Sequence, residues 1–475
     1  IAYVGNTATK VEHGKFIDII KANRSPGSLL KPLLYAAALN DGLILPKQLL
    51  QDIPIYKNGF IPKNFDRKFR GVIPANKALS SSLNVPYVHL LSEYEYKRFY
   101  HLLKKIGYTN LNHPPDHYGL SLILGTAETS LWGITAVYAG MAKAYLTFPK
   151  RPLNSGYSYS DYHKNYFLNS AVKAKKDTTL NSSGLLSVEA IEATFKAMQE
   201  LERPEQESGW ESFLSKKKIA WKTGTSYGFR DAWAIGLNDK YVVGVWVGNA
   251  NGEPRSDLIG IRAAAPLLFD LFRLLDGDSI LNNTPMGSLE NICLQSGMLA
   301  KAICKRQVLQ ELTENAVLKA KKCTYHVSLK LNQKETHQVD SNCYDVFDMV
   351  SKDYFVLSPV QSWYYMQHQP NYVLPPPFLK GCKKKETTSK IQLLYPQKNA
   401  TISIPKEQGG TLGKVVFQAA HQNPEGRVYW HLDEQFIGVT EHNHQLSLNA
   451  SAGVHILTLV DNFGNEIKWS FKIEK

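Results

Sequence analysis

Apolar residues with helical spacing follow a Pro-Gly turn near the start of the chain. The apolar positions after this turn are Leu29, Leu30, Leu33, Leu34, Ala37 and Ala38. They repeat at three- and four-residue intervals and stop at Asn40-Asp41-Gly42, a normal helix end. Pro32 has no amide hydrogen and is tolerated only in a first helical turn. The pattern therefore predicts a helix that begins near Ser28, although proline disfavours helical geometry at Lys31.

Further periodic stretches predict the elements of one mixed domain. Strands are expected over residues 1–6, 16–20, 219–226, 231–236 and 241–248, and helices from Pro86 and over residues 131–145, 188–201 and 262–275. The polar stretch 148–183 is predicted to be a surface loop. The two early and three late strands would form one antiparallel sheet, with helices between them in sequence. This is an α+β domain covering residues 1–277.

The last part of the chain changes in character. Residues 278–388 contain every cysteine, polar loops and the aromatic run Trp363-Tyr364-Tyr365, and they are predicted to be a connector. Residues 389–475 show strand after strand, separated by turns such as Asn462-Phe463-Gly464. They are predicted to be an all-β, immunoglobulin-like sandwich with Trp430 and Trp469 in its core.

Composition limits the classes of protein and partner. With 475 residues, of which 43% are apolar and 20% charged, the chain is globular material for two or three domains. A formal charge of +13 suits an anionic partner, but the lysines fall in short runs typical of solvated loops, and no nucleic-acid-binding motif occurs. No stretch is long enough to span a membrane and no signal peptide opens the chain, so we expect an excised part of a longer protein.

The five cysteines leave their pairing open. They are Cys293, Cys304, Cys323, Cys343 and Cys382. Their wide spacing lacks the Cys-x-x-Cys pairs typical of zinc sites, so no metal site is predicted. Structural disulfides in an oxidising compartment are favoured over buried reduced cysteines, and the odd count leaves at least one thiol free.

The predicted helix start carries a hydroxyl and an amine one turn apart. Ser28 and Lys31 are three residues apart and therefore share a helix face. The helix dipole stabilises negative charge on the serine oxygen, and a desolvated lysine can accept the hydroxyl proton. Ser-x-x-Lys is also common by chance, and taken alone a single instance is better explained by a capping serine followed by a surface lysine.

Two further stretches carry polar groups near predicted element ends. Ser82 and Asn84 flank a leucine before a helix, so both can face one pocket, or simply cap that helix. Gly224 lies inside a predicted strand, where glycine marks the close approach of another backbone, such as a bound peptide, or a β-bulge. Lys222 and Thr225 are nominally on opposite strand faces, but strand twist can turn both toward a bound carboxylate.

Together, Ser-x-x-Lys, Ser-x-Asn and Lys-Thr-Gly, in this order, resemble the signature of active-serine penicillin-recognising enzymes. The chain is similar to the transpeptidase domain of penicillin-binding proteins, and other stretches resemble one type within that family. These stretches are Arg24 to Ser28, residues 220–233, residues 245–248, and Trp363-Tyr364-Tyr365 with His368, Pro370 and Leu374-Pro375-Pro376. The resemblance covers essentially the whole chain. It implies a penicillin-binding/β-lactamase-like domain, with a five-stranded sheet between helices and an all-helical subdomain, followed by the connector and the sandwich.

The resemblance also implies the residues that react. Ser28 would be the acylated nucleophile and Lys31 its general base, while Ser82 would relay a proton to the leaving amine. Lys222 would keep the electrostatic field positive beside Ser82. The backbone amides of Ser28 and Thr225 would form the oxyanion hole.

Four residues would bind substrate according to the same resemblance. Asn84 would hold the substrate amide, Thr223 and Gly224 would belong to the substrate-binding strand, and Thr225 would bind the terminal carboxylate of the donor peptide or the equivalent group of a β-lactam. No cofactor and no metal are implied.

The implied function is peptidoglycan D,D-transpeptidation through a serine acyl-enzyme. Its partners would be stem peptides and β-lactams, with a cell-wall protein as a candidate partner of the sandwich. An anchor and a glycosyltransferase domain would precede the chain, at the periplasmic face of the inner membrane. The alternatives are a D,D-carboxypeptidase or β-lactam hydrolase, and a non-catalytic sensor or cell-wall-binding module. The intact Ser28, Lys31, Ser82, Asn84 and Lys222 argue against the non-catalytic alternative.

Overall fold

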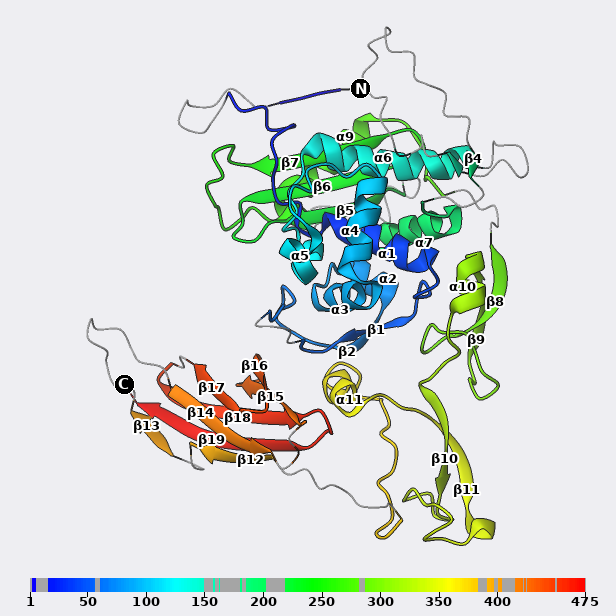
Figure 1. Ribbon diagram of the computed structural model, residues 1–475, viewed down its shortest axis with the longest axis vertical. Helices are drawn as coiled ribbons and strands as arrows, with labels where there is room; N and C mark the ends of the chain where they lie inside the picture. The colour runs from blue at the N-terminus through cyan, green and yellow to red at the C-terminus, as the bar shows by residue number, and fades with distance from the viewer. Residues whose placement is uncertain are drawn as a thin grey trace. The chain divides into compact units, whose positions relative to one another are not determined.

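The chain folds into two compact units. The computed structural model describes residues 2–5, 16–55, 60–148, 157–158, 162, 180–181, 185–201, 218–281, 287–382, 391–396, 400–403, 415–421, 423, 425–448 and 451–474. The first unit comprises Ile1–Leu50, Pro74–Ala300 and Arg306–Lys322, and the second comprises Gln51–Ile73, Lys301–Lys305 and Cys323–Lys475. Most of the helices belong to the first unit, and the C-terminal strands belong to the second (Figure 1).

The helix predicted near Ser28 is present in the first unit. It opens with the 3-10 turn Gly27–Leu30 and continues as α1, Lys31–Asn40. Lys31 has φ −60° and ψ −44°, and its N–H donates to the carbonyl of Ser28. The proline that follows therefore does not keep Lys31 from helical geometry. The tighter first turn places Pro32 where its missing amide hydrogen costs no hydrogen bond.

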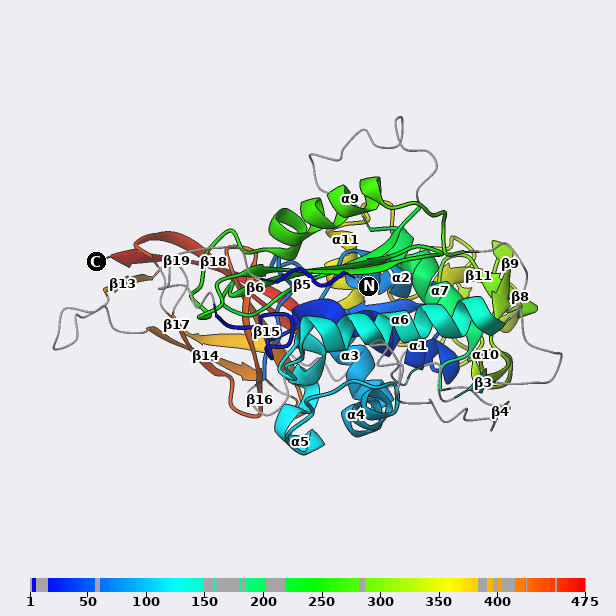
Figure 2. The ribbon, with the colours of Figure 1, turned by 90° about the horizontal axis from the view of Figure 1, so that it is seen from above.

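Three antiparallel strands form the central sheet of the first unit in the order β5-β6-β7. They are β5, Ala220–Thr225; β6, Asp231–Leu237; and β7, Val242–Gly248, as the sequence predicts. Helix α9, Ala265–Leu274, covers one face, and Trp221 packs on Phe269 there. Helices α6, Leu131–Thr147, and α7, Val188–Gln199, pack on the sheet from the other side (Figure 2).

The two N-terminal strands expected from the sequence are not strands in the described residues, so the expectation of a five-stranded sheet is not met there. Residues 2–5 and 16–20 have no strand pairing, and residues 6–15 lie outside the described part. Asp18 instead accepts the backbone N–H groups of Lys21 and Ala22, which closes a turn. This turn buries Ile19 and Ile20 in a small apolar cluster, so these apolar side chains are shielded from water without forming a strand.

The remaining elements of the first part of the chain are mostly short. The helices are α2, Ala75–Ser80; α3, Val85–Tyr94; α4, Tyr96–Lys105; α5, Pro115–Tyr118; the 3-10 helix Gly119–Leu124; the π-helical turn Gly260–Ala264; and α10, Glu314–Lys319. The strand pairs are β1, Leu49–Asp52, with β2, Gly71–Pro74; β3, Tyr157–Ser158, with β4, Leu180–Asn181; and β8, Ser288–Cys293, with β9, Gln307–Leu312. The predicted loop 148–183 lies largely outside the described residues. None of the described helices is both long and apolar enough to cross a membrane.

The described part of the second unit includes a two-stranded antiparallel sheet, a short 3-10 helix, an α-helix and a β-sandwich. The elements before the sandwich are β10, His326–Leu331; the 3-10 helix Val346–Asp348; β11, Val350–Phe355; and α11, Pro359–Met366. The sandwich sheets have the orders β12-β14-β17 and β13-β19-β18-β15-β16. Their strands are β12, Ile391–Tyr395; β13, Thr401–Ser403; β14, Val415–His421; β15, Arg427–Leu432; β16, Gln435–Glu441; β17, Gln445–Leu448; β18, Gly453–Asp461; and β19, Glu466–Glu474. Trp430 is fully buried in the core and Trp469 packs against it, as predicted.

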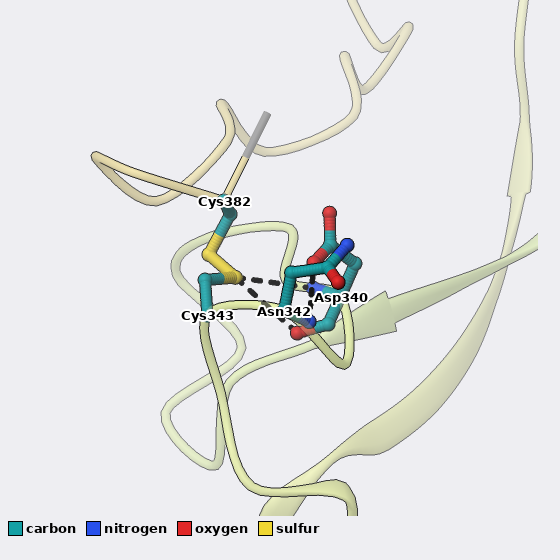
Figure 3. Close-up of a disulfide and its surroundings, with 4 residues drawn as sticks. All are labelled: Asp340, Asn342, Cys343 and Cys382. Atoms are coloured by element: carbon teal, nitrogen blue, oxygen red, sulfur yellow. Dashed lines mark hydrogen bonds between the residues drawn. A yellow bond between two sulfur atoms is a disulfide. The ribbon is translucent and has the colours of Figure 1, made fainter. Parts of the chain in front are cut away.

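The cysteines fall into two groups, one of which forms a disulfide. Cys343 and Cys382 form a disulfide, which links the β10–β11 connection to the residues after α11 (Figure 3). This confirms the expectation of a structural disulfide for one pair. Cys293, Cys304 and Cys323 are buried and do not take part in that disulfide.

Candidate active site

The turn that carries Ser28 lies directly against the end of strand β5. A Cβ atom added to Gly27 would lie 2.4 Å from the carbonyl oxygen of Thr225, and one added to Gly224 would lie 2.2 Å from the carbonyl oxygen of Pro26. Both glycines are therefore needed for two backbones to touch. The sequence predicted a close approach at Gly224. The approaching backbone is the chain's own Pro26, and the unbroken register from Ala220 to Thr225 excludes a bulge.

Lys31 is fully buried one helical turn after the half-buried Ser28. Its Nζ donates to the carbonyl oxygen of Ser82 and to Oδ1 of Asn84, both at 2.7 Å. Asn84 precedes α3 but makes no side-chain cap to that helix. The interpretations of Lys31 as a surface lysine and of Asn84 as a helix cap are therefore both wrong.

Lys222 approaches the same loop from strand β5. It is fully buried, and its Nζ donates to Oγ of Ser82 at 2.7 Å and to the carbonyl of Thr223 at 2.8 Å. Ser82 has φ +51°, a conformation in which its carbonyl meets Lys31 while its hydroxyl meets Lys222. One serine thus joins two lysines that come from distant parts of the sequence.

Burial changes the proton affinity of both amines. Desolvation lowers the pKa of Lys31 well below its usual range, and the neighbouring charge of Lys222 lowers it further. Desolvation also lowers the pKa of Lys222, to about 7. All four acceptors of the two amines are uncharged oxygen atoms, so no carboxylate in these contacts offsets the loss of hydration. The site therefore favours a neutral amine at Lys31.

Thr225 ends strand β5 on the face opposite Lys222. Its Oγ1 accepts the N–H of Gly260 at 2.9 Å, so the hydroxyl proton can be donated to another group. Thr223 shares this face, because a Cβ added to Gly260 would lie 3.0 Å from Cβ of Thr223. The strand therefore presents hydroxyls on one side and the Lys222 amine on the other.

Several residues that the sequence did not single out hold the Ser28 turn in place. Tyr138 donates to the carbonyl of Leu29, and the Trp233 indole donates to the carbonyl of Ser25, each at 2.8 Å. Ser25 in turn donates to the carbonyl of Gly125 at 2.8 Å. Tyr138 lies in an apolar helical pattern that gave no sign of this role. Trp233 lies in β6, whose residues are all buried, and the predicted strand gave no sign of its hydrogen-bond partner.

The structure thus gathers the predicted residues around one loop, one helix start and one strand end. Ser82, Asn84, Lys31 and Lys222 form one hydrogen-bonded network, while Thr225 meets the Ser28 turn through its backbone. The predicted residues offer hydroxyls, amines and a carboxamide. This donor set suits proton transfer and anion binding, and it contains none of the thiolate, imidazole or carboxylate groups that bind metal ions.

Comparison with known proteins gives two matching families and several relatives. Residues 3–258 match the penicillin binding protein transpeptidase domain, and residues 380–473 match the Penicillin-Binding Protein C-terminus Family. Penicillin-binding protein 1C of Escherichia coli is 36% identical over 262 residues, which cover 54% of this chain and 30% of that protein. This match, together with the two matching families, confirms the type within the family that the sequence stretches resemble. Penicillin-binding protein 1A of Aquifex aeolicus is 29% identical over 273 residues, 55% of this chain and 35% of that protein.

Among solved structures, penicillin-binding protein 1A from Haemophilus influenzae superimposes with a TM-score of 0.48 and 18% identity, over 64% of this chain and 50% of that one. The match thus covers only part of these relatives, since the chain spans 30% and 35% of the two curated proteins. The transpeptidase match itself covers more than half of the chain and includes every predicted site residue. The chain therefore belongs to the penicillin-binding protein transpeptidase domain family.

Proposed function

We propose that this chain is a peptidoglycan D,D-transpeptidase that works through a serine acyl-enzyme. Ser28 attacks the D-Ala-D-Ala bond of a stem peptide, D-alanine leaves, and an amine of a neighbouring stem peptide takes the acyl group. β-Lactams acylate the same serine. The observation that carries this proposal is the buried Lys31 amine, one turn from Ser28, with two uncharged acceptors.

Lys31 is suited to act as the general base. A neutral amine has two N–H donors and one lone pair, and the two donors are used by the Ser82 carbonyl and Asn84 Oδ1. The lone pair remains to accept the hydroxyl proton of Ser28. The lowered pKa of Lys31 keeps the amine neutral before reaction, which a general base requires.

Ser82 and Lys222 are suited to move that proton onward. The Ser82 hydroxyl accepts from Lys222, so its own proton is available for the leaving amine. The amine takes this proton as its bond to the acyl carbon breaks, and the proton that Lys31 took from Ser28 passes to the Ser82 oxygen. Lys222 stabilises the negative charge that develops on Ser82 during this exchange.

The end of β5 is suited to bind the acyl group and the substrate carboxylate. A Cβ at Gly27 would lie 2.7 Å from the backbone nitrogen of Thr225, so the amides of Ser28 and Thr225 belong to adjoining backbones. We propose that these two amides bind the oxyanion. The hydroxyl of Thr225 would donate to the terminal carboxylate of the donor peptide or of a β-lactam, and Asn84 would contact the substrate amide.

Intact-mass measurement with a fluorescent penicillin tests the nucleophile. The wild-type chain should gain one covalent adduct, and Ser28→Ala should gain none, whereas Ser81→Ala, at an exposed serine, should label normally. An unlabelled wild type, or equal labelling of Ser28→Ala, would overturn the assignment. Stem peptide with and without an acceptor amine then separates reaction types. A cross-linked product supports transpeptidation, and release of D-alanine to water alone supports the carboxypeptidase alternative.

We further propose that the chain acts at the periplasmic face of the inner membrane, as part of a longer anchored protein. Its predicted parts are residues 1–277, 278–388 and 389–475, the last of which would contact a cell-wall protein. Limited proteolysis tests the division, since cleavage should concentrate near residues 277 and 388. Cleavage inside the sandwich before either boundary would contradict it.

A further inference from the structure

The three cysteines outside the disulfide gather around a histidine, away from the candidate active site. Cys293, Cys304, Cys323 and His326 each offer one ligand atom, and these atoms all lie within 4.8 Å of one another. The three cysteine side chains are buried and His326 is half-buried. Cys293 ends β8 and His326 begins β10, while Cys304 and Cys323 lie in connecting segments.

The distances suit ligands around a small ion. Nδ1 of His326 lies 3.3 Å from Sγ of Cys323 and 3.6 Å from Sγ of Cys304. In a tetrahedral zinc site, with Zn–S of about 2.3 Å and Zn–N of about 2.0 Å, a sulfur and a nitrogen ligand lie about 3.6 Å apart. The two distances to Nδ1 of His326 lie close to this value, and all four ligand atoms lie within 4.8 Å of one another.

We propose that Cys293, Cys304, Cys323 and His326 bind one zinc ion that stabilises the fold. Three thiolates and one imidazole form a donor set typical of structural zinc sites. Four protein ligands fill the coordination shell, so this site leaves no position for substrate or water. Each cysteine loses its proton on binding, and the ion with its four ligands carries one net negative charge.

The surroundings suit thiolate ligands. The backbone N–H of Lys301 donates to Sγ of Cys304 at 3.4 Å, as amides do around bound thiolates. Exposed basic residues adjoin two ligands in the sequence, Lys305 after Cys304 and Lys322 before Cys323. Positive charge nearby favours thiolates and offsets the net charge of the site. The ring of His326 is also held against Phe355, with 5.4 Å between ring centroids.

The same geometry explains why the sequence did not predict this site. The sequence pattern typical of zinc sites is the Cys-x-x-Cys pair, whereas the local pair here is Cys323-x-x-His326. The other two ligands come from separate segments, which only the fold brings near. Cys343 and Cys382 pair with each other, so the odd count of five cysteines is divided into one disulfide and the three cysteines of this cluster.

Metal analysis of the wild-type chain tests the proposal directly. The chain is purified without chelator and dialysed, and zinc and iron are measured by mass spectrometry. We expect about one zinc per chain and three thiols that react only after a chelator or denaturant removes the metal. Replacement by Co²⁺ should give the visible absorption of tetrahedral thiolate coordination. A zinc-free chain after incubation with zinc, iron in place of zinc, or a second disulfide among the three cysteines would overturn the proposal.

Variants identify the ligands. Cys304→Ser, Cys323→Ser and His326→Gln should each lower zinc content or affinity by about tenfold or more, and Cys293→Ser tests the fourth ligand in the same way. The double variant Cys343→Ser with Cys382→Ser is the matched control, because it removes the disulfide and keeps every ligand. Chelation of zinc from the wild type should lower its melting temperature, and this readout does not depend on whether a variant folds. Equal zinc binding by His326→Gln, or an unchanged melting temperature, would contradict the assignment.

Discussion

Buried ionisable side chains have different kinds of partner in the two units. In the first, Lys31 and Lys222 are fully buried and all four of their acceptors are uncharged oxygens. In the second, the carboxylate of Asp461 is equally buried, but it accepts the N–H groups of Phe463 and Asn465 and the Asn465 side chain, and it lies 3.0 Å from His421. The two lysine amines therefore have no opposite charge beside them, whereas the Asp461 carboxylate has several hydrogen-bond donors.

We expect this difference between a site that carries out chemistry and a site that stabilises the fold. Burial makes the Lys31 amine costly to protonate. The amine therefore stays neutral, and its lone pair can accept a proton in the reaction. A carboxylate with a full set of donors fixes the turn between β18 and β19 instead. Removing Lys31 should therefore harm catalysis and spare stability, whereas removing Asp461 should do the reverse.

The largest expected effect is on acylation in Lys31→Met. Loss of the base should lower the acylation rate by about 10²- to 10⁴-fold, while the melting temperature stays the same or rises because a buried amine is gone. Stopped-flow acylation by a chromogenic β-lactam and thermal unfolding measure the two quantities. Lys218→Met, at an exposed lysine, is the control and should change neither. A variant that unfolds more easily but acylates normally would reverse the comparison.

Asp461→Ala should destabilise the second unit. The groups that donate to Asp461, including the buried His421, lose their acceptor. Removing one partner of a buried pair costs about 3–5 kcal/mol of unfolding free energy. Denaturant unfolding followed by tryptophan fluorescence measures this. Asp433→Ala is the matched control, because its pair with His455 has a half-exposed carboxylate, so the cost should stay below about 1 kcal/mol. The acylation rate should stay at the wild-type value in both, and equal costs would contradict the argument.

Gly224→Ala tests whether the active-site backbone needs its close contact. The new methyl group would lie 2.2 Å from the Pro26 carbonyl, and we expect a loss of about 1–3 kcal/mol together with slower acylation as the Ser28 turn moves. Unfolding and acylation are measured on the same preparation. Gly5→Ala, with no atom near its added methyl, should behave like wild type. Full activity in Gly224→Ala would show that the turn can move without consequence.

The smallest expected effect is the pH dependence of acylation. Lys31 must be neutral, so acid that protonates it slows the reaction. Lys222 must be charged, and its lowered pKa of about 7 means that it loses its proton as pH rises through this value. The rate should therefore fall by up to about tenfold per pH unit on the alkaline side. Lys222→Arg, which keeps its charge, should move this decline in rate to higher pH. If the decline stays at the same pH, it comes from the titration of another group.

The sequence predicted most local elements, and it named the groups that we propose to react. Helical spacing marked the helix from Ser28 to Asn40, strand-length segments between turn residues marked β5 to β7, and regular turns marked the sandwich, because each depends on neighbouring residues. The N-terminal strands were predicted wrongly, because the apolar residues Ile19 and Ile20 are equally well buried by a turn.

By itself, then, the sequence determined which groups could react: a serine, two lysines, a second serine and an asparagine in a recognisable order. Only the tertiary structure decided that both lysines are buried, that Ser82 joins them, and that Gly224 meets Pro26. Lys222 and Ser82 are 140 positions apart. Periodicity reports only which face of an element is apolar, and hydrogen bonds over such separations exist only once the elements have packed together.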